Sequence, residues 1–89
     1  MARRILYVVT EDWYFLSHRL PMARAAKAAG YEVHVATRLK DGRPAIEREG
    51  FVAHALSWRR GSLSPAGNLS AIMALRRLIR TLRPAILHN

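Results

Sequence analysis

The chain has 89 residues, a mass of 10.1 kDa and a formal net charge of +9, so it has room for at most one small domain. Hydrophobic residues make up 51% of the chain, which excludes a disordered basic tail. The absence of cysteine excludes a disulfide scaffold, a thiolate zinc site and a cysteine nucleophile, and favours a cytoplasmic location. No apolar run approaches the ~20 residues of a membrane span.

The first half of the chain alternates between strand and helix patterns. Residues 4–10 form an apolar run that predicts a buried strand. Residues 16–29 have helical spacing, and the start of this helix is left open. Either Ser17 caps it, or Pro21 is its first residue after an irregular turn at 15–19. A strand is expected at 32–37, followed by a turn at 40–43.

The second half continues the alternation. A short helix at 44–49 begins with proline and ends before Gly50, and a weaker strand follows at 51–56. After a loop at 61–67, an amphipathic helix is predicted at 68–82 and a strand at 85–88. This order predicts an α/β fold with a Rossmann-like parallel sheet in strand order 3-2-1-4. The fourth strand would lie near the middle of a complete sheet, so we expect a part of a larger domain. The alternative is a miniature four-stranded protein.

The segment that follows the first strand carries the densest group of functional side chains. Residues 10–19 contain no glycine, which disfavours a dinucleotide or P-loop site here. They hold two acids, three aromatic residues, a histidine and an arginine. Glu11, Asp12 and Trp13 could bind a sugar through carboxylates and an aromatic face, or could favour the helix start and fill the core. His18 and Arg19 could meet a phosphate or hydroxyl, or be structural.

Several stretches resemble the opening of a GT-B-fold glycosyltransferase similar to family four. The most specific is Phe15-Leu16-Ser17-His18-Arg19-Leu20-Pro21, and residues 5–14, 23–26, 30–37, 50–51, 58–61 and 82–88 continue the likeness in order. The resemblance implies two Rossmann-like domains around a cleft. The N-terminal domain would bind a lipid- or polysaccharide-linked acceptor and the C-terminal one a nucleotide-sugar donor, with retention of configuration and no cofactor or metal.

On that resemblance, residues 1–89 would be the first half of the acceptor-side domain. The donor domain would be absent, so we expect no transfer by these residues alone. Many relatives have a glycine-rich first loop near the donor phosphate, and this chain departs from them there. His18 and His88 match positions where the family often has histidine, and both are candidate cleft and catalytic residues.

Two arginine groups are further candidates. Trp58, Arg59 and Arg60 follow the third strand, and paired guanidinium groups suit the diphosphate of a lipid-linked acceptor. Residues 59–89 contain six arginines and no acid. Four of them could dock on an anionic membrane at the inner face of the cell, or form the solvated side of a helix: Arg76, Arg77, Arg80 and Arg83. His34 and His54 lie within strands and are expected to be structural.

Two other functions remain open. The chain could be a non-catalytic, membrane-docking subunit of a split glycosyltransferase. A small basic nucleic-acid-binding protein is disfavoured, because no known nucleic-acid module is present and the aromatic residues lie far in sequence from the arginine cluster.

Overall fold

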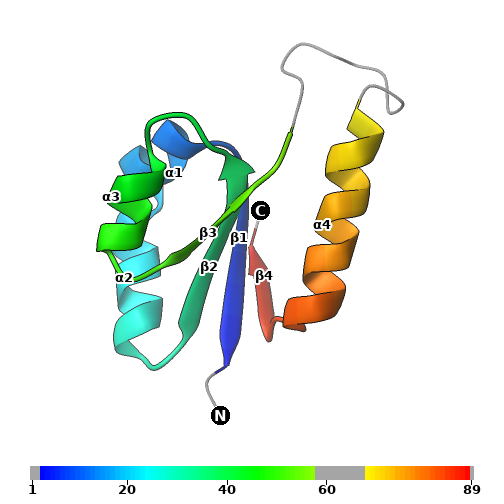
Figure 1. Ribbon diagram of the computed structural model, residues 1–89. Coiled ribbons are helices and arrows are strands. Elements are labelled where there is room, and N and C mark those ends of the chain that lie inside the picture. Colours follow the sequence, from blue (N-terminus) through cyan, green and yellow to red (C-terminus); the bar gives the residue numbers. More distant parts are fainter. Residues whose placement is uncertain (1–2, 58–67, 89) are drawn as a thin grey trace.

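The structure, a computed structural model, describes residues 3–57 and 68–88. The described residues form four strands and four helices in alternating order (Figure 1). The elements are β1 (Arg4–Glu11), α1 (Asp12–His18), α2 (Leu20–Ala28), β2 (Glu32–Arg38), α3 (Arg43–Arg48), β3 (Val52–Ala55), α4 (Leu69–Leu82) and β4 (Ile86–His88).

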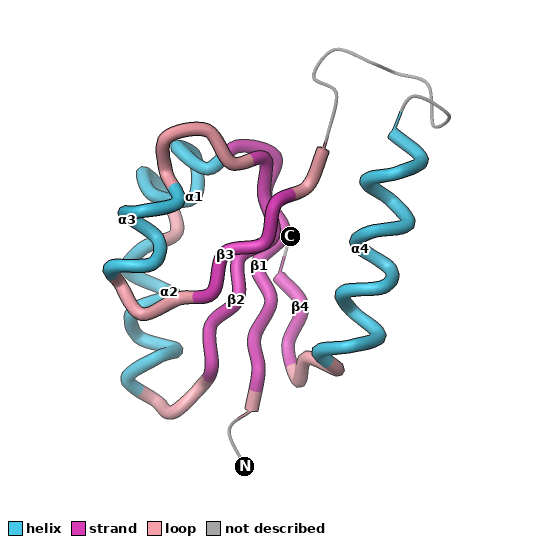
Figure 2. The backbone as a smooth tube through the Cα atoms, viewed as in Figure 1, coloured by secondary structure: helices cyan, strands magenta, loops and turns pink. Residues whose placement is uncertain are grey.

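The strands form one parallel sheet in the order β3-β2-β1-β4 (Figure 2). Tyr7 of β1 faces Val35 of β2 on one side and His88 of β4 on the other. The predicted α/β class and strand order are therefore confirmed. The order follows from the sequence pattern, because each helix returns the chain to the same end of the sheet and so makes the next strand parallel.

The helices cover the two faces of the sheet unequally: α1, α2 and α3 lie on one face and α4 on the other (Figure 1). Alternate residues of each strand point to opposite faces. Ile5, Tyr7 and Val9 therefore pack with the three-helix layer, whereas Leu6 and Ala36 pack with the α4 side chains Leu75, Leu78, Ile79 and Leu82. Leu6 is fully buried there, and burial of a leucine contributes about 1.5–3 kcal/mol.

The region after β1 differs from the prediction. Residues 12–18 are helical, so no irregular turn occupies 15–19 and Ser17 caps neither helix. The helical pattern expected at 16–29 belongs to two helices that meet at Arg19, and the second begins one residue before Pro21. Pro21 is the physical reason for the break. It has no N–H to bond to the carbonyl four residues before it. Two residues before it, Arg19 has φ −115° and ψ −6°, and this φ departs from the value of about −63° in a regular helix. The other predicted boundaries differ by a residue or so.

Helix α4 is bound to the sheet along one stripe, and its opposite face is exposed. Leu69 and Met73 are more than half exposed although they are large and apolar. The helix ends where Arg83 adopts the left-handed conformation, with φ 47° and ψ 59°. None of the helices in the described residues is long and apolar enough to cross a membrane.

Candidate functional site

The carboxyl ends of all four strands lie at one edge of the sheet. The side of β1 on which new strands are added changes between β3 and β4. From β1 the chain first adds β2 and β3 on one side, and then crosses over to add β4 on the other. Open parallel sheets bind ligands at the carboxyl edge beside such a switch point. The residues at the carboxyl ends of β1, β2 and β4, with those that follow β1 and β2, therefore form the candidate site.

Glu11 is the last residue of β1 and is buried. Its side chain is 8% exposed, and Oε1 lies 3.7 Å from Arg38 Nη1 at the end of β2. The other carboxylate oxygen, Oε2, is buried without a hydrogen-bond partner among the described residues. Burial of an unpaired carboxylate oxygen costs free energy, and groups of this kind gather at functional sites.

Asp12 is also buried, and its carboxylate fixes the loop between β2 and α3. Oδ2 accepts hydrogen bonds from the backbone N–H groups of Lys40, at 2.7 Å, and Gly42, at 2.8 Å. Oδ1 accepts one from the N–H of Trp13, at 2.8 Å. Burial alone would raise the pKa of Asp12, but these amide hydrogen bonds outweigh it and hold the pKa below its usual value.

Gly42 permits this arrangement by its lack of a side chain. A Cβ atom at this position would lie 2.8 Å from Asp12 Oδ2 and 2.9 Å from Asp12 Cβ. The loop can approach Asp12 this closely only with glycine here. Asp12 thus has a structural role, and its contact with an acceptor stays a prediction.

The indole of Trp13 is 52% exposed at the start of α1. It borders a pocket of about 240 Å³, here called the Trp13 pocket, between α1 and the β2–α3 loop. The pocket combines apolar walls with one basic and two acidic side chains, and it is lined by Asp12, Trp13, Leu16, Lys40, Asp41, Gly42 and Ala45. An exposed aromatic face beside charged groups is suited to stacking on the apolar face of a sugar ring while the charged groups bond its hydroxyls.

The junction of α1 and α2 gathers a second group of side chains around Tyr14. The His18 ring stacks on the Tyr14 ring at 4.3 Å, and its Nδ1 lies 3.3 Å from the Tyr14 carbonyl. The Arg19 guanidinium lies 5.4 Å from the centre of the Tyr14 ring, within cation–π range. The Nε of Arg19 is buried without a hydrogen-bond partner among the described residues.

Tyr7 joins this group to β4. Its ring lies 5.2 Å from that of His88, whose Nδ1 is buried and unpaired within the described residues. Burial raises the pKa of Tyr7, and the positive charge of Arg19 partly offsets that increase. The neutral phenol, Arg19 and His88 therefore share one region beside the switch point, and can donate hydrogen bonds to an oxygen-rich ligand.

The remaining predicted residues lie elsewhere. Arg76, Arg77 and Arg80 line, with Met73, a shallow groove of about 260 Å³ on α4, on the opposite face of the sheet from α1 (Figure 1). Arg83 is exposed at the end of that helix. Trp58, Arg59 and Arg60 lie outside the described residues. In the part of the chain that is described, no group of three or more His, Asp or Glu side chains could hold a metal ion.

Sequence reasoning missed four contributors to the site: Tyr7, Arg38, Lys40 and Asp41. In the sequence, nothing distinguishes Tyr7 from the other apolar residues of the first strand. Arg38 carries a usable signal, because it directly follows the second strand, at the same sheet edge as Glu11. Lys40 and Asp41 are recognised only as turn residues.

Comparison with known proteins gives a consistent result. The profile of a family described as "Glycosyl transferase 4-like" matches residues 4–89. A Bacillus subtilis (strain 168) protein named "Putative glycosyltransferase EpsD" is 30% identical over 88 residues, which is 99% of this chain. The chain spans 22% of the length of that relative.

Proposed function

The chain belongs to the glycosyl transferase 4-like family, and on this premise we propose that it forms the acceptor side of a glycosyltransferase. The whole enzyme would move a sugar from a nucleotide-sugar to a lipid- or polysaccharide-linked acceptor. The donor would be bound by a further domain, and these 89 residues alone would not transfer sugar. No cofactor is invoked.

The observation that carries this proposal is the exposed indole of Trp13 beside the Trp13 pocket. The pocket lies at the carboxyl edge of the sheet, where this fold class binds ligands. In the proposal, Trp13 stacks on an acceptor sugar while Lys40 and Asp41 bond its hydroxyls. Arg19 and His88 lie near Tyr7 beside the switch point, and Glu11 ends β1 at the same sheet edge. Each has a buried polar atom without a partner among the described residues, and in the proposal these atoms meet the reacting end of the acceptor.

The proposal is tested with the full-length protein by release of nucleotide from a panel of nucleotide-sugars, in the presence of glycan and lipid-linked acceptors. Trp13→Ala should raise the KM for the acceptor about 5- to 150-fold if sugar stacking contributes as much as the ~1–3 kcal/mol of a base stacked on an aromatic ring. The KM for the donor should stay as in the wild type. Met22→Ala is the matched control, because Met22 is also large, apolar and half exposed, but lies on α2. An unchanged acceptor KM in Trp13→Ala would refute the assigned role.

We further propose that α4 places the enzyme on the inner face of the cell membrane. One side of α4 carries the exposed Leu69 and Met73, followed at helical spacing by Arg76, Arg77 and Arg80. Apolar side chains can enter the lipid boundary while arginines bind anionic headgroups. At ~1 kcal/mol for each basic residue, three arginines correspond to on the order of 100-fold in vesicle affinity.

Co-sedimentation of the full-length protein with phosphatidylglycerol vesicles tests this placement. Replacement of Arg76, Arg77 and Arg80 by Gln should weaken binding on the order of 100-fold at low salt. Replacement of the exposed Arg3, Lys27 and Arg48 by Gln removes the same charge elsewhere and should have a much smaller effect. Equal losses in the two triple variants would show that net charge, and not α4, drives binding.

A further inference from the structure

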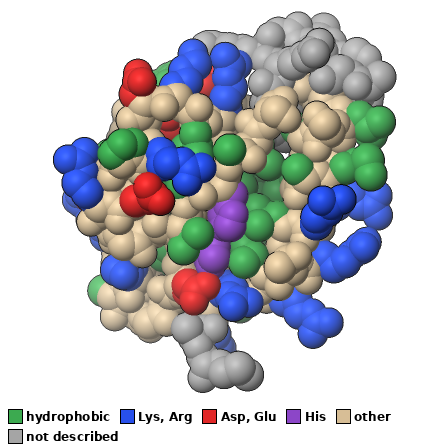
Figure 3. Space-filling model, in the orientation of Figure 1, with side chains coloured by type: hydrophobic (Ala, Val, Ile, Leu, Met, Phe, Trp, Pro, Cys, Tyr) green, Lys and Arg blue, Asp and Glu red, His purple; other side chains and the backbone are tan. Residues whose placement is uncertain are grey.

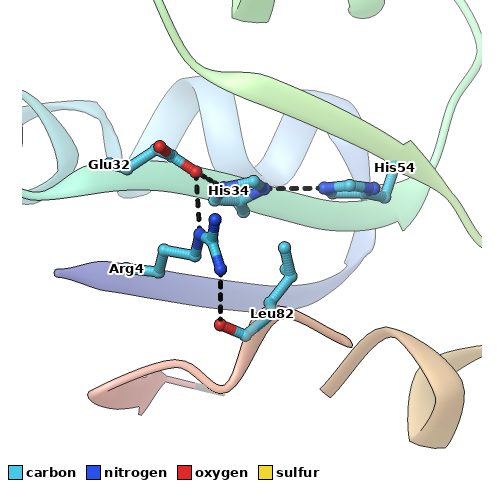
Figure 4. A network of polar contacts seen from close by, with 5 residues as sticks. All are labelled: Arg4, Glu32, His34, His54 and Leu82. Atoms are coloured by element: carbon cyan, nitrogen blue, oxygen red, sulfur yellow. Dashed lines mark hydrogen bonds and ion pairs between the residues drawn. The ribbon is translucent and has the colours of Figure 1, made fainter. Parts of the chain in front are cut away.

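A chain of polar contacts crosses the sheet on the face that α4 covers (Figure 4). Glu32 Oε1 accepts hydrogen bonds from Arg4 Nε, at 3.0 Å, and from His34 Nε2, at 2.6 Å. His34 Nδ1 lies 2.8 Å from His54 Nε2. Arg4 also donates from Nη1 to the carbonyl of Leu82, at 3.1 Å. The contacts therefore connect β1, β2 and β3 to the last residue of α4.

The two histidines at the centre of this chain are shielded from water to different degrees. His34 is 5% exposed, and His54 is half-buried on the edge strand β3. Their rings are stacked, with centres 5.1 Å apart and planes 16° apart. Figure 3 shows histidine side chains in the middle of the visible face, among hydrophobic side chains. The surroundings of the pair therefore constrain which protons the two rings can carry.

Only one hydrogen atom can lie between His34 Nδ1 and His54 Nε2. An ionised Glu32 carboxylate can only accept, so His34 Nε2 carries a hydrogen. His34 Nδ1 then either accepts from His54 or, when His34 is charged, donates to His54. If both rings were charged, Nδ1–H and Nε2–H would point at each other across 2.8 Å, and the hydrogen bond could not form.

Few negatively charged groups lie close enough to the pair to offset the positive charge of a second ring. Within the described residues, Glu32 is the one carboxylate bonded to the pair, and it is already shared with Arg4. Arg43 of α3 adds positive charge that acts on His54. Helix α4 offers no carboxylate, since residues 59–89 contain no acid. Burial, the charge of His34 and the charge of Arg43 together lower the pKa of His54 below the ordinary value of 6.5.

We propose that the His34–His54 pair is an acid-sensitive switch: it holds the edge strand β3 to β2 while at most one of the two rings is charged, and it releases β3 when a further proton charges both rings. Strand β3 has four residues and pairs with β2, so the His34–His54 contact adds a side-chain bond to a short backbone ladder. Leu56, directly after β3, packs in the hydrophobic cluster beneath α4. Release of β3 therefore also disturbs the packing of α4 against the sheet.

The sign of the pH effect follows from the lowered pKa of His54. The open strand binds a proton at His54 more readily than the closed one does. Closure is therefore fully favoured above pH 6.5 and is lost as the pH falls from 6.5 towards the pKa of the closed state. Within that window, the opening equilibrium constant should rise up to ~10-fold for each pH unit, as expected for uptake of one proton.

Carbon-13 histidine NMR of the full-length protein between pH 8 and 5 tests the switch. A ring-to-ring nuclear Overhauser effect identifies the pair without mutation. We expect the His54 signal to titrate below pH 6.5, and the amides of 52–56, corrected for intrinsic exchange, to lose protection in the same pH range. Titration of His54 at or above pH 6.5 overturns the proposal.

A variant pair sharpens the test. His54→Gln keeps a polar side chain that cannot take up a proton, so the pH dependence of exchange at 52–56 should disappear. His18→Gln removes an exposed histidine from α1 and should leave that dependence unchanged. The same pH slope in His54→Gln and wild type also overturns the proposal. If His54→Gln does not fold, the wild-type titration alone decides.

Discussion

Removing the carboxylate of Asp12 should release the loop that forms one wall of the Trp13 pocket. Two loop amides, those of Lys40 and Gly42, donate to Asp12 Oδ2 at 2.7 and 2.8 Å. Hydrogen bonds to a charged group contribute about 1.5–3 kcal/mol each. The third donor, the N–H of Trp13, lies in the first turn of α1, where water can replace the carboxylate. Asp12→Ala should therefore destabilise the closed loop by about 3–6 kcal/mol.

Hydrogen exchange of the full-length protein, read on peptides that cover residues 38–46, measures this loss. A destabilisation of about 3 kcal/mol corresponds to exchange on the order of 100-fold faster at the amides of Lys40 and Gly42. Asp41→Ala is the matched control, because it removes an exposed carboxylate from the same loop. Exchange of these amides in Asp12→Ala within threefold of the wild type would refute the reasoning.

The pH dependence gives an independent reading of the same group. The pKa of Asp12 is lowered in the folded state. Its contribution to stability is therefore complete above the unfolded-state pKa of about 4 and is lost as the pH falls through the folded-state value. Asp12→Asn keeps one acceptor oxygen and no titratable proton. Its stability between pH 5 and pH 2 should fall less steeply than that of the wild type.

Two further substitutions separate stability from activity. Gly42→Ala should destabilise the protein by about 1–3 kcal/mol in urea unfolding, because the new Cβ would lie 2.8 Å from Asp12 Oδ2; unfolding at the wild-type urea concentration would contradict the close approach. Glu11→Gln should leave stability within about 1 kcal/mol of the wild type, since it removes a buried and poorly paired charge. It should lower kcat/KM for sugar transfer at least tenfold, and equal transfer by variant and wild type would argue against a role for Glu11 in the site.

The strand order could be predicted from the sequence because it depends on alternation and handedness, which local patterns carry. Helix α1 could not. Its N-terminal residues lack a recognisable cap, and the carboxylate of Asp12 instead bonds a loop 28 and 30 residues further along the chain. A helix start that depends on such distant partners has no local sequence signal. Pro21, by contrast, carries a usable signal: one of the two starts left open places it at the first position of a helix, and α2 begins one residue earlier, at Leu20.

The candidate site shows the same division. Glu11, Trp13 and His88 could be selected because each lies at a predicted strand end. The His34–His54 contact could not be predicted, since it depends on strand register. Ala36, and not His34, is the residue directly opposite His54. A shift of one residue between β2 and β3 would place the two rings on opposite faces of the sheet.

The most direct test of the proposed acceptor role is an NMR titration of the Trp13 indole N–H in the full-length protein. The ligand is the acceptor found in the nucleotide-release assay, and Trp13→Ala assigns the signal. The proposed function predicts a shift of this signal that saturates over the same acceptor concentrations as sugar transfer. A Trp13 signal that stays unchanged while transfer is saturated would contradict the assignment of this edge of the sheet as the acceptor site.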